Sequence, residues 1–250
     1  MRLSVLDQSI AVAGRPQDLS IRNTVALAQH CEALGFERFW VSEHHNHPTI
    51  VGTAPEIVIA AIAATTKSIR IGSAGIMLPH YSAFKVAEVF RVLDALAPGR
   101  IDLGLGRAPG SDGRTAFALH PMANERPEHF PSDVRDLIAW LHDEPMVQGH
   151  PFAAVKAYPH TETAPEVWIL GSSDYGAQVA ALFGLPYCYA WFFSDGAGGE
   201  HVVHLRAGIR ITQQAFLVAH VGILASQRGQ RRLGRRRRRR ECPSGRRPGS

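Results

Sequence analysis

The 250-residue chain contains only three cysteines, Cys31, Cys188 and Cys242. Three scattered thiols cannot build a disulfide framework or a zinc knuckle, and so low a number is typical of a reducing compartment. No apolar run reaches the roughly 18–20 residues that a membrane-spanning helix needs, and Met1 leads directly into an expected strand rather than into a signal peptide. We therefore expect a cytoplasmic protein without a membrane partner.

Basic residues are scarce outside the carboxyl end. Residues 226–250 hold 11 of the 27 Lys and Arg side chains and one of the 22 acids, so residues 1–225 hold 16 basic and 21 acidic side chains. This balance predicts no nucleic-acid partner for the folded part. The tail at 227–250, which contains the run Arg235 to Arg240, is interpreted as a disordered or aberrant end. The alternative is a basic arm for nucleic acid or anionic lipid.

The chain shows a regular alternation of strand-like and helix-like segments. Strands are expected near residues 3–7, 38–43, 69–77, 100–106, 166–171, 187–193 and 220–225. Helices are expected near residues 21–34, 55–66, 82–96, 132–143, 174–183 and 200–208. Such alternation predicts a mainly parallel α/β sheet, and seven strands favour a (β/α)8 TIM barrel over an open sheet. Residues 108–165 exceed a normal connection and are interpreted as an active-site insertion that carries one helix.

Polar residues follow the expected second strand, at the end of a strand where parallel α/β proteins keep their active sites. They are Glu43, His44, His45 and, slightly further on, His47. A neutral imidazole there is suited to general-base chemistry, with Glu43 able to orient it. A metal site is the alternative, because carboxylates and imidazoles are common zinc ligands. A loop stabilised by polar side chains is the simplest interpretation.

Two further segments are typical of anion binding. Arg107 follows the fourth strand between flexible glycines, and a guanidinium there can hold a phosphate through two hydrogen bonds. The preceding Gly104-Leu105-Gly106 lacks the third glycine and the helix start of a dinucleotide fingerprint. Ser172 and Ser173 end the fifth strand just before a helix, so their hydroxyls and the helix amides can converge on a phosphate. Such a sequence is also a common helix cap.

In this order and spacing, the segments resemble the bacterial luciferase-like flavin-dependent monooxygenases. The resemblance covers residues 3 to about 225 and rests on Gly35-Phe36, residues 41–46, 71–80, 93–94 and 98–100, the Arg107 segment, residues 171–173 and 184–186. It implies a TIM barrel at 1–226, with insertion 108–165 and tail 227–250. Family members continue into an eighth strand where this chain becomes arginine-rich, so we expect a barrel truncated after its seventh strand. A shift of reading frame is one interpretation of the tail.

The resemblance also implies roles for individual residues. His44 would transfer protons, with Glu43 beside it near the isoalloxazine ring. The family's non-proline cis peptide would fall at Ala74-Gly75 and support that ring. The remaining cofactor positions are Arg107, Ser172 and Ser173 at the flavin phosphate, Gly176 through its backbone amide, and Trp191 near the cofactor or in the barrel core.

The implied reaction is the oxidation of a small organic substrate by O2 with reduced FMN as co-substrate. The resemblance further implies that a separate flavin reductase delivers the FMN and that the chain forms a homodimer. Deazaflavin-dependent relatives share the fold, so a deazaflavin is the alternative cofactor. A metal-dependent barrel hydrolase and a non-catalytic fragment with a basic tail are the competing functions.

Overall fold

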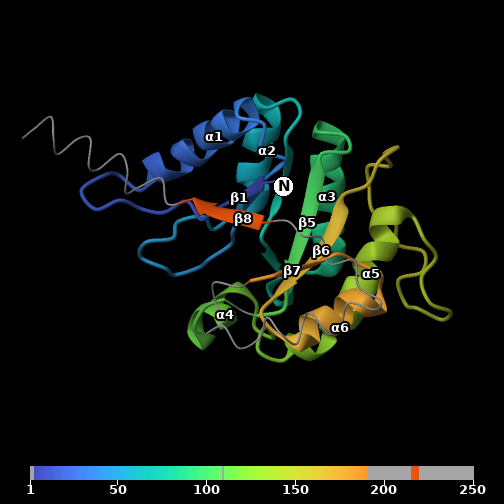
Figure 1. Cartoon of the computed structure of the whole chain (residues 1–250). Coiled ribbons are helices and arrows are strands. Elements are labelled where there is room, and N and C mark those ends of the chain that lie inside the picture. The colour runs from blue at the N-terminus through green and yellow to red at the C-terminus, as the bar shows by residue number, and fades with distance from the viewer. Residues whose placement is uncertain (1–2, 109, 191–214, 220–250) are drawn as a thin grey trace, which may run out of the picture.

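All strand pairing within the sheet is parallel in the computed structural model, which describes residues 3–108, 110–190 and 215–219. The strands are β1 (Leu3–Asp7), β2 (Arg38–Val41), β3 (Arg70–Ser73), β4 (Ile76–Met77), β5 (Ile101–Gly106), β6 (Glu166–Gly171), β7 (Tyr187–Tyr189) and β8 (Ala215–Ala219). Their order is β7-β6-β5-β3-β2-β1-β8, and β4 pairs with β5. The order and the parallel pairing confirm the predicted barrel architecture (Figure 1).

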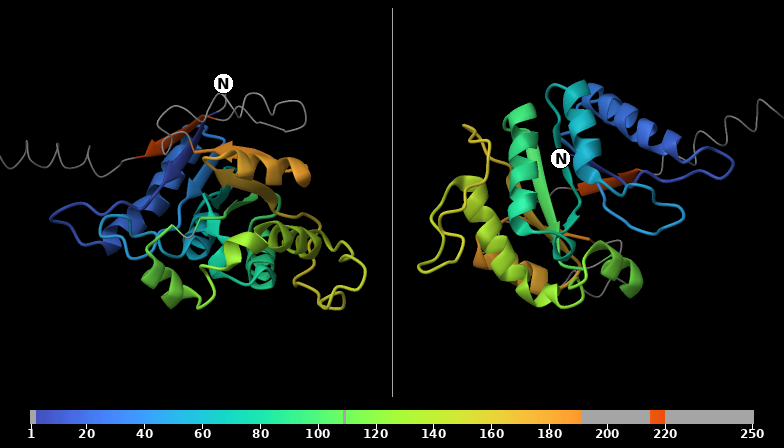
Figure 2. Two further views of the ribbon diagram at one scale, coloured as in Figure 1. Left: turned by 90° about the horizontal axis from the view of Figure 1, so that it is seen from below. Right: turned by 180° about the vertical axis from the view of Figure 1, so that it is seen from behind.

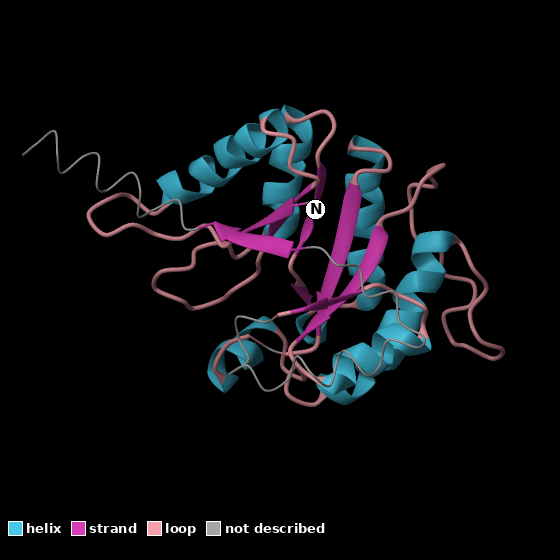
Figure 3. Cartoon of the chain, viewed as in Figure 1, coloured by secondary structure: helices cyan, strands magenta, loops and turns pink. Residues whose placement is uncertain are grey.

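Helices cover the outer face of this sheet, apart from the short α4 (Gly113–Leu119), which lies beyond the ends of the strands (Figures 1 and 3). They are α1 (Asp18–Ala33), α2 (Pro55–Thr65), α3 (Ala83–Leu96), α4 (Gly113–Leu119), α5 (Phe130–His142) and α6 (Asp174–Leu182), with 3-10 turns η1 (Leu78–His80) and η2 (Arg126–His129). Figure 2 shows α2 and α3 side by side, and α3 also packs against α5. The helices within the described residues include none that is long and apolar enough to cross a membrane.

Alternation along the strands separates two different faces. Phe39, Ile71 and Leu103 point to the helices and belong to a large apolar core. Their neighbours Trp40 and Trp168 lie on the inner face, where the two rings meet edge to face at 5.2 Å. Successive side chains of a strand point to opposite faces, so the helix-facing side of the sheet is mainly apolar, with exceptions such as Asp7, which accepts a hydrogen bond from Thr24 of α1.

The predicted third strand at 69–77 is interrupted, because residues 74 and 75 separate β3 from β4. The peptide bond between Ala74 and Gly75 is cis, as the resemblance implied. A Cβ atom on Gly75 would lie only 2.7 Å from the carbonyl oxygen of Gly104, so this close approach to β5 requires glycine. Counted as one, β3 and β4 occupy a single barrel position.

Differences from the expected elements concern the insertion and the carboxyl end. The insertion carries α4 as well as the expected α5, and buried Arg91 of α3 holds it by donating hydrogen bonds to the carbonyl oxygens of Trp140, Leu141 and Pro159. Strand β8 lies at 215–219 and pairs with β1, just before the expected strand at 220–225. That expected strand and the helix at 200–208 lie outside the described residues. Within the described residues, no pairing joins β7 to β8.

Candidate functional site

The carboxylate of Glu43, just after β2, is buried and accepts three hydrogen bonds. The Tyr81 hydroxyl and His45 Nε2 each lie 2.7 Å from Oε1, and the amide nitrogen of Met77 lies 3.0 Å from Oε2. Burial and the neighbouring carboxylate raise the pKa of Tyr81 far above its usual value, so its hydroxyl remains a donor. Sequence reasoning missed Tyr81 and Met77, since nothing local to either residue indicates a partner some 35 positions away.

His44 lies beside this carboxylate in the chain and takes no part in its hydrogen bonds. Its backbone amide donates to the Gly52 carbonyl at 3.0 Å, while its ring is half-buried and 6.3 Å from the ring of His47. Nδ1 is buried and has no hydrogen-bond partner among the residues that the structure describes. Burial, followed by the charge of His47, lowers the pKa of His44, so the imidazole is neutral at pH 7. A neutral ring with an unpartnered buried nitrogen is suited to proton transfer with a ligand.

The Ala74–Gly75 segment follows β3 and is joined to the end of β2 by a hydrogen bond from the Ala74 amide to the Val41 carbonyl oxygen at 2.7 Å. Ala74 packs on the inner-face cluster of Leu6, Trp40 and Trp168, together with Leu170 and Cys188. Burial raises the pKa of the Cys188 thiol to about 12, so this side chain acts as an apolar group. The segment therefore presents backbone and small side chains above an apolar floor.

Arg107 and the serine pair converge although 65 residues separate them in the chain. The Arg107 guanidinium lies 4.1 Å from the ring centroid of Tyr175, in the first turn of α6, and the Arg107 side chain is exposed. Ser172 and Ser173 are exposed at the start of the same helix. Ser173 occupies the N-cap position, yet its hydroxyl accepts no capping hydrogen bond. A guanidinium, two hydroxyls and free helix amides together form donors of the kind that bind a phosphate.

Tyr187 fixes the shape of the segment at the start of α6. Its hydroxyl donates to the carbonyl oxygen of Ser173 at 3.0 Å, and its ring packs against Gly176. A Cβ atom on Gly176 would lie 3.0 Å from that ring, so the glycine has a packing reason as well as an available amide. Sequence reasoning missed Tyr175 and Tyr187. The predicted cofactor residue Trp191 lies outside the described residues.

The opposite end of the strands holds a buried charge cluster that sequence reasoning also missed. Asp102 is fully buried and pairs with Arg38 at 2.7 Å and with Arg70 at 2.5 Å. Trp40 Nε1 donates to the same carboxylate at 2.8 Å, and Arg38 also pairs with Glu166 at 3.0 Å. Burial raises the pKa of Asp102, and the two guanidinium groups oppose this shift. These paired charges close the amino-terminal end of the inner face.

Two other candidate sites differ from this arrangement. The proposed metal ligands Glu43, His44 and His47 do not converge, and the described residues contain no group of three His, Cys, Asp or Glu side chains that could hold a metal ion.

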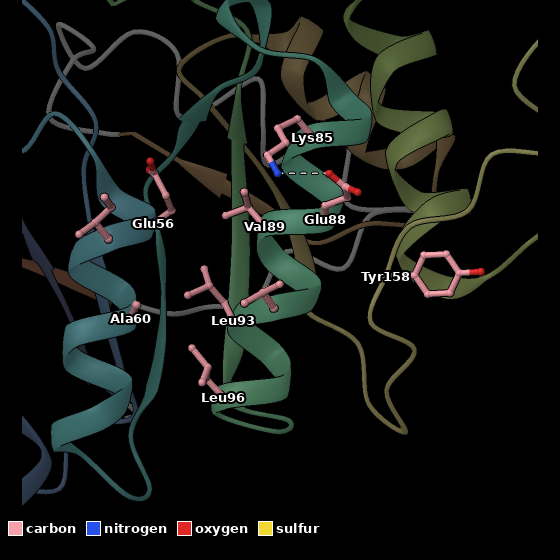
Figure 4. Close-up of a pocket in the computed structure, with 10 residues that line it drawn as sticks. Glu56, Ala60, Lys85, Glu88, Val89, Leu93, Leu96 and Tyr158 are labelled. Atoms are coloured by element: carbon pink, nitrogen blue, oxygen red, sulfur yellow. Dashed lines mark hydrogen bonds and ion pairs between the residues drawn. The ribbon is translucent and has the colours of Figure 1, made fainter.

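A separate groove of about 400 Å³ lies between α2 and α3, lined by residues that include Ile57, Leu93 and Leu96 (Figure 4). It lies in the outer helical layer, so it is distinct from the strand ends that carry His44 and Arg107.

Comparison with known proteins agrees with this geometry. The family of luciferase-like monooxygenases matches residues 1–230. An uncharacterized protein, YwcH of Bacillus subtilis, is 50% identical over 201 residues, which cover 80% of this chain and 60% of that protein. The N-acetyl-S-alkylcysteine monooxygenase of the same organism is 41% identical, over 81% of this chain and 60% of its own length. The chain thus spans about 60% of the length of these curated relatives.

Solved structures show the same fold. Apo-MsnO8 is 42% identical and superimposes with a TM-score of 0.68, covering 76% of this chain and 55% of its own. The oxygenating constituent of 3,6-diketocamphane monooxygenase from Pseudomonas putida, in complex with FMN, has a TM-score of 0.64 at 17% identity, over 86% and 66% of the two chains. An F420-dependent secondary alcohol dehydrogenase has a TM-score of 0.56 at 17% identity, over 74% and 57%. Neighbours of this fold therefore bind FMN or F420.

Proposed function

Since the chain belongs to the luciferase-like monooxygenase family, we propose that it binds reduced FMN at the carboxyl ends of its strands and uses O2 to oxidise a small organic substrate. The single observation that carries this proposal is the convergence of Arg107 with the first turn of α6 while His44 keeps an unpartnered buried nitrogen. One end of the site can hold a phosphate and the other offers a neutral imidazole, which suits a flavin mononucleotide.

The proposed residue roles follow from this fit. Arg107, Ser172, Ser173 and the amide of Gly176 would bind the phosphate, and Ala74–Gly75 would support the ring system. Reduced flavin, when bound, supplies the oxygen chemistry. His44 would hold or move a proton at Nδ1, and Glu43 would keep the neighbouring loop in place. The apolar floor of Trp40 and Trp168 would exclude water from the ring.

The decisive experiment is an anaerobic titration of the full chain with reduced FMN. Saturable binding is expected, and reduced riboflavin, which lacks the phosphate, should bind about 10- to 100-fold more weakly because the charge-assisted bonds to Arg107 are absent. Equal affinity for the two flavins would contradict the phosphate site. Tighter binding of reduced F420 would assign the deazaflavin instead. Oxygenation is then assayed with small thioethers, the class named by the relative that acts on N-acetyl-S-alkylcysteine.

A flavin reductase and a second copy of the chain are the proposed partners. The groove between α2 and α3 supports the homodimer, because exposed apolar side chains line it: Ile57 is 67% exposed and Leu96 is 61% exposed. Replacing Leu96 with Glu should convert a dimer to a monomer in sedimentation velocity. Exposed Leu34, which does not line the groove, provides the matched Leu34→Glu control.

A further inference from the structure

Glu43 and His44 are adjacent in the chain but differ in their partners: the Glu43 carboxylate accepts three hydrogen bonds, whereas His44 Nδ1 has no hydrogen-bond partner among the described residues. The Glu43 side chain contacts Tyr81, at the end of η1, and the charge of Glu56 of α2 acts on it, so it lies on the helix-facing side. The His44 ring instead lies 6.3 Å from the ring of His47. The Glu43 carboxylate is thus held by the segments that surround it and is not itself the unpartnered group offered to the proposed flavin.

Three segments of the chain meet at this one carboxylate. His45 belongs to the loop after β2, Met77 follows the Ala74–Gly75 segment, and Tyr81 precedes α3. Each of these segments offers one donor to the Glu43 carboxylate. A buried carboxylate with several donors holds those donors in one geometry, because each bond replaces hydration that the buried group has lost.

We infer that Tyr81 and His45 are positioning residues which, through Glu43, hold the His44 loop and the Ala74–Gly75 segment in register for flavin binding. The inference rests on the proposed function. It extends the site by two residues that would act through their hydrogen bonds to Glu43. Tyr81 supplies a permanently neutral donor, while His45 donates from Nε2 and so has its tautomer set by the carboxylate.

A double-mutant cycle on the affinity for reduced FMN tests this inference. Tyr81→Phe removes one hydroxyl and keeps the ring, whereas Glu43→Gln leaves at least one of the three donors facing an amide N–H. Each change should weaken binding about tenfold, as expected for the loss of a hydrogen bond to a charged group. The double variant should bind no more weakly than Glu43→Gln alone, because Tyr81 acts only through Glu43. The exposed Tyr158 provides the control Tyr158→Phe, which should leave affinity unchanged.

The outcomes separate the two proposals. An unchanged affinity in Tyr81→Phe, or an additive loss of about 100-fold in the double variant, would overturn the positioning role while FMN binding by the unaltered chain still supports the function. Failure of the unaltered chain to bind reduced FMN would overturn the proposed function, and the positioning role with it. Urea unfolding of each variant checks that the titrated protein is folded. If Tyr81→Phe does not fold, His45→Phe, which removes the Nε2 donor and keeps a ring, completes the same cycle.

Discussion

The two ends of the parallel strands differ in whether they carry polar groups that remain available to a ligand. At the amino-terminal end, buried Asp102 pairs with buried Arg38 and with Arg70, whose side chain is 26% exposed. At the carboxyl end, His44 Nδ1 has no partner among the described residues and Arg107 is exposed. The first arrangement stabilises the sheet and the second remains available to a ligand. Under the proposed function, the buried ion pairs and the bound ligand would lie at opposite ends of the same strands, as in other barrels of this type.

The largest effect is expected from Asp102→Ala at the amino-terminal end. The change leaves the buried guanidinium of Arg38 and the partly exposed guanidinium of Arg70 without their shared carboxylate, which should lower the free energy of unfolding by about 3–5 kcal/mol. Urea denaturation measures this quantity. Glu166→Ala is the control from the same cluster, since its side chain is 41% exposed and its loss should cost below about 1 kcal/mol. Equal losses of unfolding free energy in the two variants would show that buried Asp102 contributes no more to stability than partly exposed Glu166.

Arg107→Ala, at the carboxyl end, should weaken flavin binding while leaving the stability of the chain almost unchanged. Affinity for reduced FMN is expected to fall about 10- to 100-fold, because one charge-assisted phosphate contact is lost. The free energy of unfolding should change by no more than about 0.5 kcal/mol, since the side chain is exposed. Arg107→Lys keeps the positive charge but lacks the planar guanidinium, so its affinity for reduced FMN should lie between those of the unaltered chain and of Arg107→Ala. A strongly destabilised Arg107→Ala chain would show that this end also serves stability.

The pH dependence of stability provides a smaller test at His44. Its pKa is lower in the folded chain than in the unfolded one, chiefly through burial, so below about pH 6.5 the unfolded state binds more protons. Folding should therefore weaken as the pH falls through that range, and this contribution is absent above it. His44→Gln should show a shallower fall in the free energy of unfolding between about pH 7.5 and pH 5. An identical slope in both chains would show that the ring is not desolvated.

The smallest effect is expected from Asp174→Asn in the first turn of α6. The exposed carboxylate lies next to Ser173, so it opposes a phosphate bound there. Removing this charge should tighten reduced FMN binding about two- to threefold at low salt, with the gain disappearing at high salt. Glu162→Gln, an exposed acid of the insertion, is the control. Weaker binding by Asp174→Asn would instead assign the carboxylate to the site.

The positions of the strand ends could be predicted from the sequence, and with them the locations of His44, Ala74–Gly75 and Arg107. The apolar residues in the segments on either side of them repeat with the period of a strand or of a helix. Backbone geometry alone sets these two periods, so the pattern predicts the elements. The break between β3 and β4 was not visible in the apolar pattern of residues 69–77 and came only through the family resemblance. Helix α4 was missed because its seven residues are too short to show a clear period.

What the sequence determined by itself is which residues follow each strand and therefore share one edge of a parallel sheet. Only the tertiary structure decided which of them meet. Glu43 accepts a hydrogen bond from Tyr81, which is 38 positions further along the chain. Arg38 donates to Asp102, which is 64 positions further along. These contacts depend on the register between strands and on the packing of helices over them, which place distant segments within hydrogen-bond distance without leaving a local pattern. The same register brings Arg107 to α6 and leaves the His44 ring nitrogen unpartnered among the described residues.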